Sequence, residues 1–319
     1  MNAMKKVYLF LLLLAGLLSA QAHPYADTAT ESPYNLVTSN GTIMGSLLLP
    51  SGAAKMPVVL IIAGSGPTDR NGNNPMMKNE RLRMLAQGLA VKGIASVRFD
   101  KRGIAASVSA GKSEADLRFD DYIQDAKAWI EQLKKDARFS KVIVVGHSEG
   151  SLIGMIAASG KADGFVSIAG AGKSADRILK EQLATQPSVI KDASYRIIDS
   201  LAEGKTVKEV HPMLFSLFRP SVQPYMISWF QPNPVAAIAK LSIPVLIVQG
   251  TYDSQITVAD AQALAAAQPA AKLVVIQKMN HVLKIIGDGQ AANAASYNNP
   301  SLPVSEELLS AVADFVLGK

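Results

Sequence analysis

The chain has 319 residues, 18% of them charged, a formal net charge of +6 and no cysteine. The absence of cysteine excludes disulfides, zinc–thiolate sites and a cysteine nucleophile. Basic and acidic residues are interspersed rather than gathered in runs, so we expect no nucleic-acid partner.

The N-terminal segment has the pattern of an export signal. Two lysines precede an apolar run over residues 7–18, and Ala20-Gln21-Ala22 offers a small-x-small cleavage site. The run is shorter than the roughly 18 apolar residues that indicate a membrane-spanning helix. We therefore predict a signal peptide over residues 1–22 and a periplasmic or secreted protein that begins at His23, without stable membrane insertion.

Short apolar runs alternate with helical patterns along most of the chain. Several runs are continuous in Val, Ile and Leu, which is typical of strands covered on both faces. The alternation predicts an α/β fold with a doubly wound, mostly parallel sheet. The predicted strands are 43–49, 58–63, 95–99, 142–145, 165–169, 245–249 and 273–277. The predicted helices are 80–91, 121–134, 149–158, 258–267 and 305–316.

One interval, residues 173–241, has helical stretches and several prolines but no strand pattern. It is too long for an ordinary connection between a strand and a helix. We predict a helical cap inserted into a core that comprises residues 23–172 and 242–319.

The candidate nucleophile lies in Gly146-His147-Ser148-Glu149-Gly150, the one Gly-x-Ser-x-Gly segment of the chain. It follows a buried-strand run and precedes a helix pattern, which is the context that a strained nucleophile turn requires. The N-terminus of the following helix favours the negative charge that develops there. The pattern therefore predicts Ser148 as a nucleophile.

A serine nucleophile needs a general base. Of the four histidines, His281 follows the predicted strand 273–277, and open α/β sheets place functional groups at such carboxyl ends. We expect His147 to project away from the nucleophile and to be structural. His281 is the predicted base.

The acid that orients the base should precede it in the chain. Asp253 lies three residues after Gly250, where the strand run ends, whereas Asp260 falls within a helix and Asp288 follows the histidine. Asp253 is the predicted acid.

These motifs resemble those of the α/β-hydrolase superfamily, from about Ile43 to the C-terminus. Within it, the segments 64–73, 100–103 and 279–284 resemble a bacterial branch of exported esterases and serine-aminopeptidase-like (S33-type) hydrolases.

The resemblance implies an oxyanion hole formed by the backbone N–H groups of Ser65 and Glu149. Many relatives carry His-Gly where this chain has Ala63-Gly64. Because the donors are backbone groups, we expect this departure to leave the oxyanion hole intact.

Three large apolar residues of the predicted cap, Met213, Phe218 and Trp229, are candidates for lining a substrate pocket. The alternative is that they belong to the cap's own core, as most of its apolar residues should.

We expect neither a metal nor a cofactor. Two Ala-Gly-Lys-Ser segments lack the earlier glycine of a phosphate-binding loop. Asp69, Asn71, Asn73 and Glu80 match part of a calcium loop, but Asn74 stands where its turn glycine belongs.

The predicted function is hydrolysis of small or medium acyl or aryl esters through a Ser-His-Asp triad and an acyl-enzyme. A peptidase that releases N-terminal residues is the alternative, with Glu149, Glu203 or Glu209 holding the substrate ammonium group. A catalytically silent binding protein is a third possibility. The expected partner is thus a small ester or a short peptide.

Overall fold

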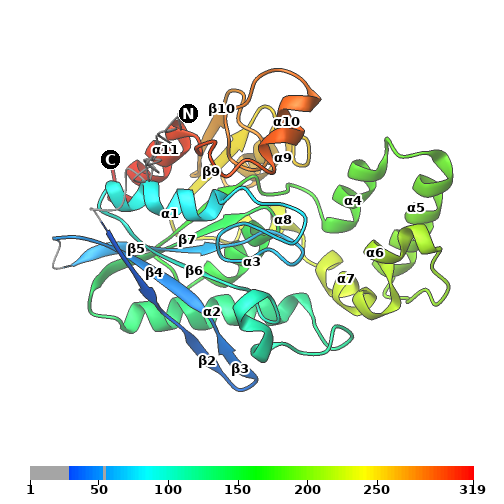
Figure 1. The fold of residues 1–319 in the computed structure, drawn as a ribbon, viewed down its shortest axis with the longest axis horizontal. Helices are drawn as coiled ribbons and strands as arrows, with labels where there is room; N and C mark the ends of the chain where they lie inside the picture. The colour runs from blue at the N-terminus through cyan, green and yellow to red at the C-terminus, as the bar shows by residue number, and fades with distance from the viewer. Residues whose placement is uncertain (1–28, 53–54) are drawn as a thin grey trace, which may run out of the picture.

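The computed structural model describes residues 29–52 and 55–319, so the predicted signal peptide and its cleavage site lie outside the described residues. Eight strands form one sheet in the order β1-β4-β6-β5-β7-β8-β9-β10 (Figure 1). β1 pairs antiparallel with β4 and β4 with β6, and all pairs beyond β6 are parallel. This arrangement confirms the predicted α/β class with a mostly parallel sheet.

The strands of this sheet, together with the separate β2–β3 hairpin, have the following bounds: β1 (Ala29–Pro33), β2 (Leu36–Thr38), β3 (Gly41–Ile43), β4 (Gly45–Pro50), β5 (Met56–Ile62), β6 (Ala95–Phe99), β7 (Phe139–His147), β8 (Gly164–Ile168), β9 (Val245–Gly250) and β10 (Lys272–Ile276).

Both faces of the sheet are covered by helices, which explains why the central strands are apolar throughout. In β5, Val58 and Leu60 face one apolar cluster while Val59 and Ile61 face the other, as the two-residue period of a strand requires. One cluster lies under α2, α3 and α9, and the other under α1 and α11. The core helices are α1 (Arg81–Val91), α2 (Phe119–Lys135), α3 (Glu149–Ala158), α9 (Val258–Ala267), α10 (Gln290–Ser296) and α11 (Glu306–Leu317), with a 3-10 turn η1 (Ala105–Ala110).

The chain between β8 and β9 is helical. We call its first part, residues 175–230, the insertion; it stands beside the sheet, at the right of Figure 1. The insertion has an apolar cluster of its own, with Ile198, Leu201 and Phe218 fully buried. Its elements are α4 (Ala175–Leu183), α5 (Ser188–Ala202), η2 (Pro212–Leu214), α6 (Phe215–Phe218), η3 (Pro220–Val222) and α7 (Gln223–Phe230). The next helix, α8 (Pro234–Ile238), packs instead against α3 and α9 of the core.

Within residues 29–52 and 55–319, no helix combines the length and the apolar character needed to cross a membrane.

Candidate active site

Ser148 occupies a strained turn between β7 and α3. Its backbone has φ 56° and ψ −124°, a conformation that L-residues seldom adopt. The flanking glycines are required by close backbone approach: a Cβ on Gly146 would lie 2.2 Å from the Gly150 carbonyl oxygen, and one on Gly150 would lie 2.3 Å from the Ile62 carbonyl oxygen. The Ser148 N–H donates to the carbonyl of Ile168 on β8 at 3.0 Å. The turn therefore holds a partly exposed serine at the carboxyl end of the central strands.

Asp253 and His281 meet at the same end of the sheet. Nδ1 of His281 lies 2.8 Å from Oδ2 of Asp253 in a pair whose side chains are 7% and 1% exposed. The other carboxylate oxygen accepts the backbone N–H groups of Gln255 and Ile256 at 2.8 and 3.0 Å, and Gln249 Nε2 lies 3.2 Å from Oδ2. An ionised Asp253 thus fixes the proton of His281 on Nδ1 and leaves Nε2 as an acceptor.

The charge state of Asp253 follows from these contacts. Burial alone would raise the pKa of its carboxyl group. The His281 ring and the backbone N–H groups of Ile256 and Gln255 outweigh burial and hold the pKa below its ordinary value. The carboxylate therefore stays ionised at neutral pH and can stabilise a protonated imidazole.

His147 supports His281 from the core side. Its Nε2 lies 2.9 Å from the His281 carbonyl oxygen, and the two ring centroids are 4.9 Å apart. Burial lowers the pKa of His147 well below its ordinary value, and the positive charge of Arg81, with that of His281 when its ring is protonated, lowers it further. A neutral ring that donates from Nε2 accounts for the contact. His147 is thus next to the candidate nucleophile in the chain and next to the candidate base in space.

The structure therefore brings His281 against His147, the chain neighbour of Ser148. No hydrogen bond joins the Ser148 hydroxyl to His281 among the described residues. Contacts between nucleophile and base are often long without substrate and shorten when it binds.

The predicted oxyanion donors lie against the candidate nucleophile. A Cβ on Gly64 would be 3.1 Å from the Ser148 Cβ, so the backbone at Gly64 packs closely against the Ser148 turn. Glu149 is the first residue of α3. Neither the Ser65 N–H nor the Glu149 N–H donates to another group in the part of the chain that the structure describes. Both are available to an oxyanion.

Sequence reasoning missed a buried polar cluster directly behind these donors. The Glu149 carboxylate accepts the Tyr225 hydroxyl of α7 at 2.6 Å and lies 3.1 Å from the Lys101 ammonium. Lys101 also donates to the Gly64 carbonyl at 2.7 Å. Burial, and then the charge of Glu149, raise the pKa of Tyr225 well above its ordinary value, so its hydroxyl remains a donor.

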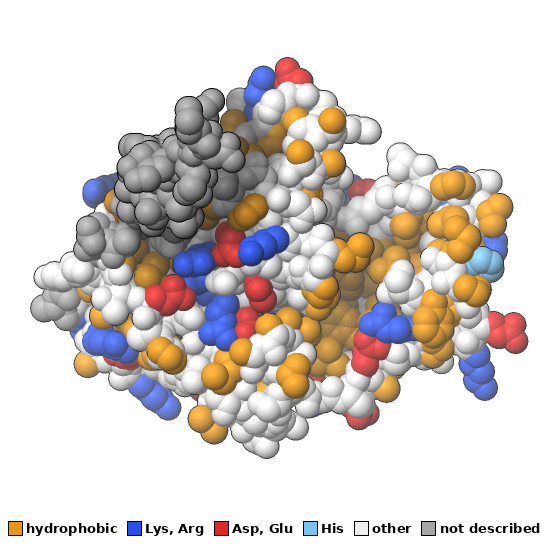
Figure 2. All heavy atoms as spheres, in the orientation of Figure 1, with side chains coloured by type: hydrophobic (Ala, Val, Ile, Leu, Met, Phe, Trp, Pro, Cys, Tyr) orange, Lys and Arg blue, Asp and Glu red, His pale blue; other side chains and the backbone are white. Residues whose placement is uncertain are grey.

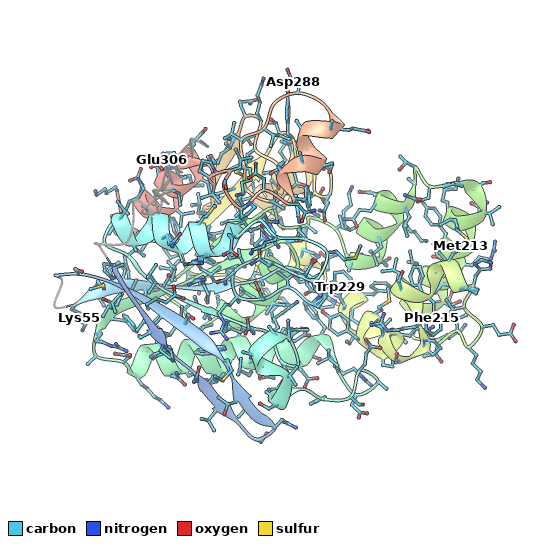
Figure 3. All side chains as sticks on the ribbon, in the orientation of Figure 1. Lys55, Met213, Phe215, Trp229, Asp288 and Glu306 are labelled. Atoms are coloured by element: carbon cyan, nitrogen blue, oxygen red, sulfur yellow. The ribbon has the colours of Figure 1, made fainter. Side chains whose placement is uncertain are left out.

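Of the three predicted pocket residues, only Trp229 lies near this site. It is at the junction between core and insertion (Figure 3), with its ring 6.2 Å from that of Tyr225. Met213 is 69% exposed at the outer end of the insertion, and Phe218 is 0% exposed within the insertion's own core. Figure 2 shows a hollow with hydrophobic side chains between core and insertion. On short helices, apolar composition alone does not show which side chains face the site. Two of the three residues predicted from it therefore lie away from the site.

The side chains of the partial calcium loop are engaged with the loop itself. Asp69 accepts the N–H groups of Asn71 and Asn73, both at 2.8 Å, and Asn73 donates to Glu80 at 2.8 Å. Among the described residues, no group of three or more His, Asp or Glu side chains could hold a metal ion.

The comparisons with known proteins agree with this geometry. The family model described as serine aminopeptidase, S33, matches residues 77–216. Esterase EstD of Thermotoga maritima is 29% identical over 262 residues, which are 80% of this chain but only 61% of that protein. Two solved structures have a similar fold over nearly their whole length: Est1E of Butyrivibrio proteoclasticus (TM-score 0.58, 16% identity, 90% of this chain and 98% of that one) and the Pyrococcus furiosus esterase Pf2001 (TM-score 0.60, 18% identity, 91% of each chain).

A mostly parallel eight-stranded sheet with a strained serine turn after β7 and an Asp–His pair after β9 and β10 defines the α/β-hydrolase fold. The chain has the fold of the α/β-hydrolase superfamily. Its sequence resemblance is to esterase-like members of that superfamily, as predicted.

Proposed function

We propose that this protein is a serine hydrolase that cleaves carboxylic esters with small to medium acyl or aryl groups. The observation that carries the proposal is the buried Asp253–His281 hydrogen bond of 2.8 Å beside the strained Ser148 turn. The similarity to EstD supports an ester as the substrate class.

In the proposed reaction, the Ser148 hydroxyl oxygen attacks the ester carbonyl carbon while His281 Nε2 takes its proton. The oxyanion that forms accepts hydrogen bonds from the N–H groups of Ser65 and Glu149. Collapse of this intermediate breaks the bond to the alcohol, which leaves with the proton from His281. Water, deprotonated by His281, then attacks the acyl-enzyme and releases the carboxylic acid and free Ser148.

A peptidase that releases N-terminal residues is the second candidate, because the matching family model is described as serine aminopeptidase. Such an enzyme needs an acidic group for the substrate ammonium. The Glu149 carboxylate is 2% exposed and already bound by Lys101 and Tyr225. Glu203 is exposed on the insertion, where it pairs with Lys205 at 2.7 Å, and Glu209 is also exposed there. These contacts favour the esterase.

The deciding experiment compares p-nitrophenyl acyl esters with aminoacyl anilides on the purified protein. We expect turnover of the esters and little of the anilides; the reverse order would establish the peptidase. Ser148→Ala should lower kcat for esters by roughly four to six orders of magnitude while the melting temperature is kept. Near wild-type turnover in that variant, or failure of the wild type to react with a fluorophosphonate probe, would favour a silent binding protein.

We also propose that the protein is exported to the periplasm or secreted, on the strength of the basic and apolar pattern in residues 1–22. Mass spectrometry of the protein from an expressing bacterium should find His23 as its first residue in the exported fraction. An intact N-terminus in the cytoplasmic fraction would contradict this.

A further inference from the structure

The Lys101 ammonium is bound to the same peptide unit that carries a proposed oxyanion donor. Its Nζ lies 2.7 Å from the Gly64 carbonyl oxygen, and the N–H at the other end of that peptide is the Ser65 N–H. None of the described peptide bonds is cis, so this C=O and this N–H lie in one plane and point in opposite directions. A donor that fixes the carbonyl therefore also fixes the direction of the Ser65 N–H.

The same contact strengthens the donor. A cation at a carbonyl oxygen draws electron density through the conjugated amide and makes its N–H a better hydrogen-bond donor. The effect is larger where water is excluded, and the Lys101 side chain is only 2% exposed. Its ammonium also lies 4.8 Å from the centre of the Tyr122 ring.

Glu149 holds Lys101 in this place and connects it to the second donor. Its carboxylate lies 3.1 Å from Lys101 Nζ, and its own backbone N–H is the other proposed donor. A single buried ion pair thus joins the two sides of the oxyanion site. A buried pair of this kind often adds little stability compared with apolar side chains of the same size, so stability alone is a weak reason for its presence.

We propose that Lys101, held by Glu149, is a positioning residue that orients and polarises the Gly64–Ser65 peptide for oxyanion binding. The inference rests on the proposed ester hydrolysis and adds to it a side chain that acts on the transition state through a backbone group. Such a residue changes kcat more than KM, because the oxyanion forms only after the substrate has bound.

The test compares Lys101→Met with the wild type in p-nitrophenyl ester hydrolysis and in inhibition by an alkyl boronic acid, which forms a tetrahedral adduct on the serine. We expect kcat to fall about 10- to 100-fold with KM changed less than about threefold, since loss of a whole oxyanion donor costs about 100- to 1,000-fold. Affinity for the boronic acid should fall by a similar factor, and Lys101→Arg should recover part of both.

The control is the same substitution at Lys92, whose ammonium pairs with Glu306 at 2.9 Å between α1 and α11. Lys92→Met should keep wild-type kcat and boronic acid affinity. If Lys101→Met does not fold, Glu149→Gln provides the second measurement, because it leaves Lys101 without its counter-charge and should also lower kcat more than KM.

A folded Lys101→Met or Glu149→Gln variant with wild-type kcat and boronic acid affinity would overturn the role of Lys101. Because Ser148-dependent turnover of the wild type is measured separately, that result would leave the proposed hydrolysis standing. A wild-type protein that hydrolyses no ester would instead remove the proposed function itself.

Discussion

The Tyr225 hydroxyl, on helix α7 of the insertion, donates a 2.6 Å hydrogen bond to the Glu149 carboxylate at the start of α3. The insertion is thereby bound to the residue that follows the candidate nucleophile. A second contact joins the two parts nearby, where the Phe119 N–H at the start of α2 donates to the Ser228 hydroxyl at 2.8 Å. The position of α7 and the geometry of the proposed oxyanion site are therefore linked.

We predict that Tyr225→Phe lowers both stability and activity. The substitution leaves a buried carboxylate oxygen without its donor, which should cost about 1–3 kcal/mol in the free energy of unfolding. Because Glu149 holds Lys101, kcat/KM for esters should also fall, by roughly threefold to tenfold. Urea unfolding and ester kinetics measure the two effects.

Tyr195→Phe is the matched control, since its hydroxyl donates to the Lys180 carbonyl at 2.7 Å within the insertion, away from Glu149. It should lower stability and leave kcat/KM unchanged. Equal kinetic effects of the two variants would show that Tyr225 has no particular link to the site.

Asp253→Asn should retain the fold and lose most of the activity. An amide in place of the carboxylate no longer fixes the Nδ1–H tautomer of His281 or stabilises its protonated form, so kcat should fall by roughly three to four orders of magnitude. Ester kinetics and the melting temperature are the measurements. Asp288→Asn, at an exposed carboxylate bound to Tyr252 and Lys278, should keep wild-type kcat. If the Asp288 variant were the inactive one, the assignment of the acid would be wrong.

The strained turn gives a third prediction, because Gly146→Ala places a methyl group within 2.6 Å of the backbone of Gly150 and Ser151. Backbone atoms cannot move aside as a flexible side chain does, so we expect a loss of about 3 kcal/mol in stability, together with loss of ester turnover. Gly287→Ala, where an added Cβ meets nothing within 4 Å, is the control and should resemble the wild type. A Gly146→Ala variant with wild-type stability and ester turnover would show that the backbone of the turn can shift enough to admit a methyl group.

Local sequence patterns were sufficient for the elements that are apolar and sharply bounded. The ranges predicted for β6, α3 and α9 are those observed, since each begins or ends at a clear change of pattern. β1 was missed because its sequence, Ala-Thr-Glu-Ser-Pro, has no apolar face and its place depends on antiparallel pairing with β4. The β2–β3 hairpin was missed because both strands are only three residues long.

The candidate site likewise has a part that local sequence patterns predict and a part that they do not. The motif around Ser148 and the position of Asp253 and His281 after strands could be read from the chain, and the structure brings Asp253 and His281 into contact. The cluster behind them could not be predicted, because Lys101 and Tyr225 reach Glu149 from 48 and 76 residues away. Such contacts depend on how the insertion and the β6 loop pack, which no local pattern specifies.

The last prediction concerns acid stability and rests on His147. Burial lowers the pKa of this ring well below 6.5 in the folded protein, whereas in the unfolded chain it titrates near its ordinary value. Below about pH 6.5 the unfolded chain therefore binds a proton that the folded protein does not, and the free energy of unfolding falls as the pH is lowered. This group alone contributes a slope of up to about 1.4 kcal/mol per pH unit.

His147→Gln keeps an N–H donor for the His281 carbonyl but cannot take up the proton, so its stability should fall less steeply between pH 7 and pH 5. Urea unfolding at pH 7, 6 and 5 measures the difference in slope. His211→Gln, at an exposed position of the insertion, should retain the wild-type slope. Equal slopes for His147→Gln and the wild type would mean that His147 takes up a proton in the folded protein as readily as in the unfolded chain. The inference that a neutral His147 ring supports His281 would then be wrong.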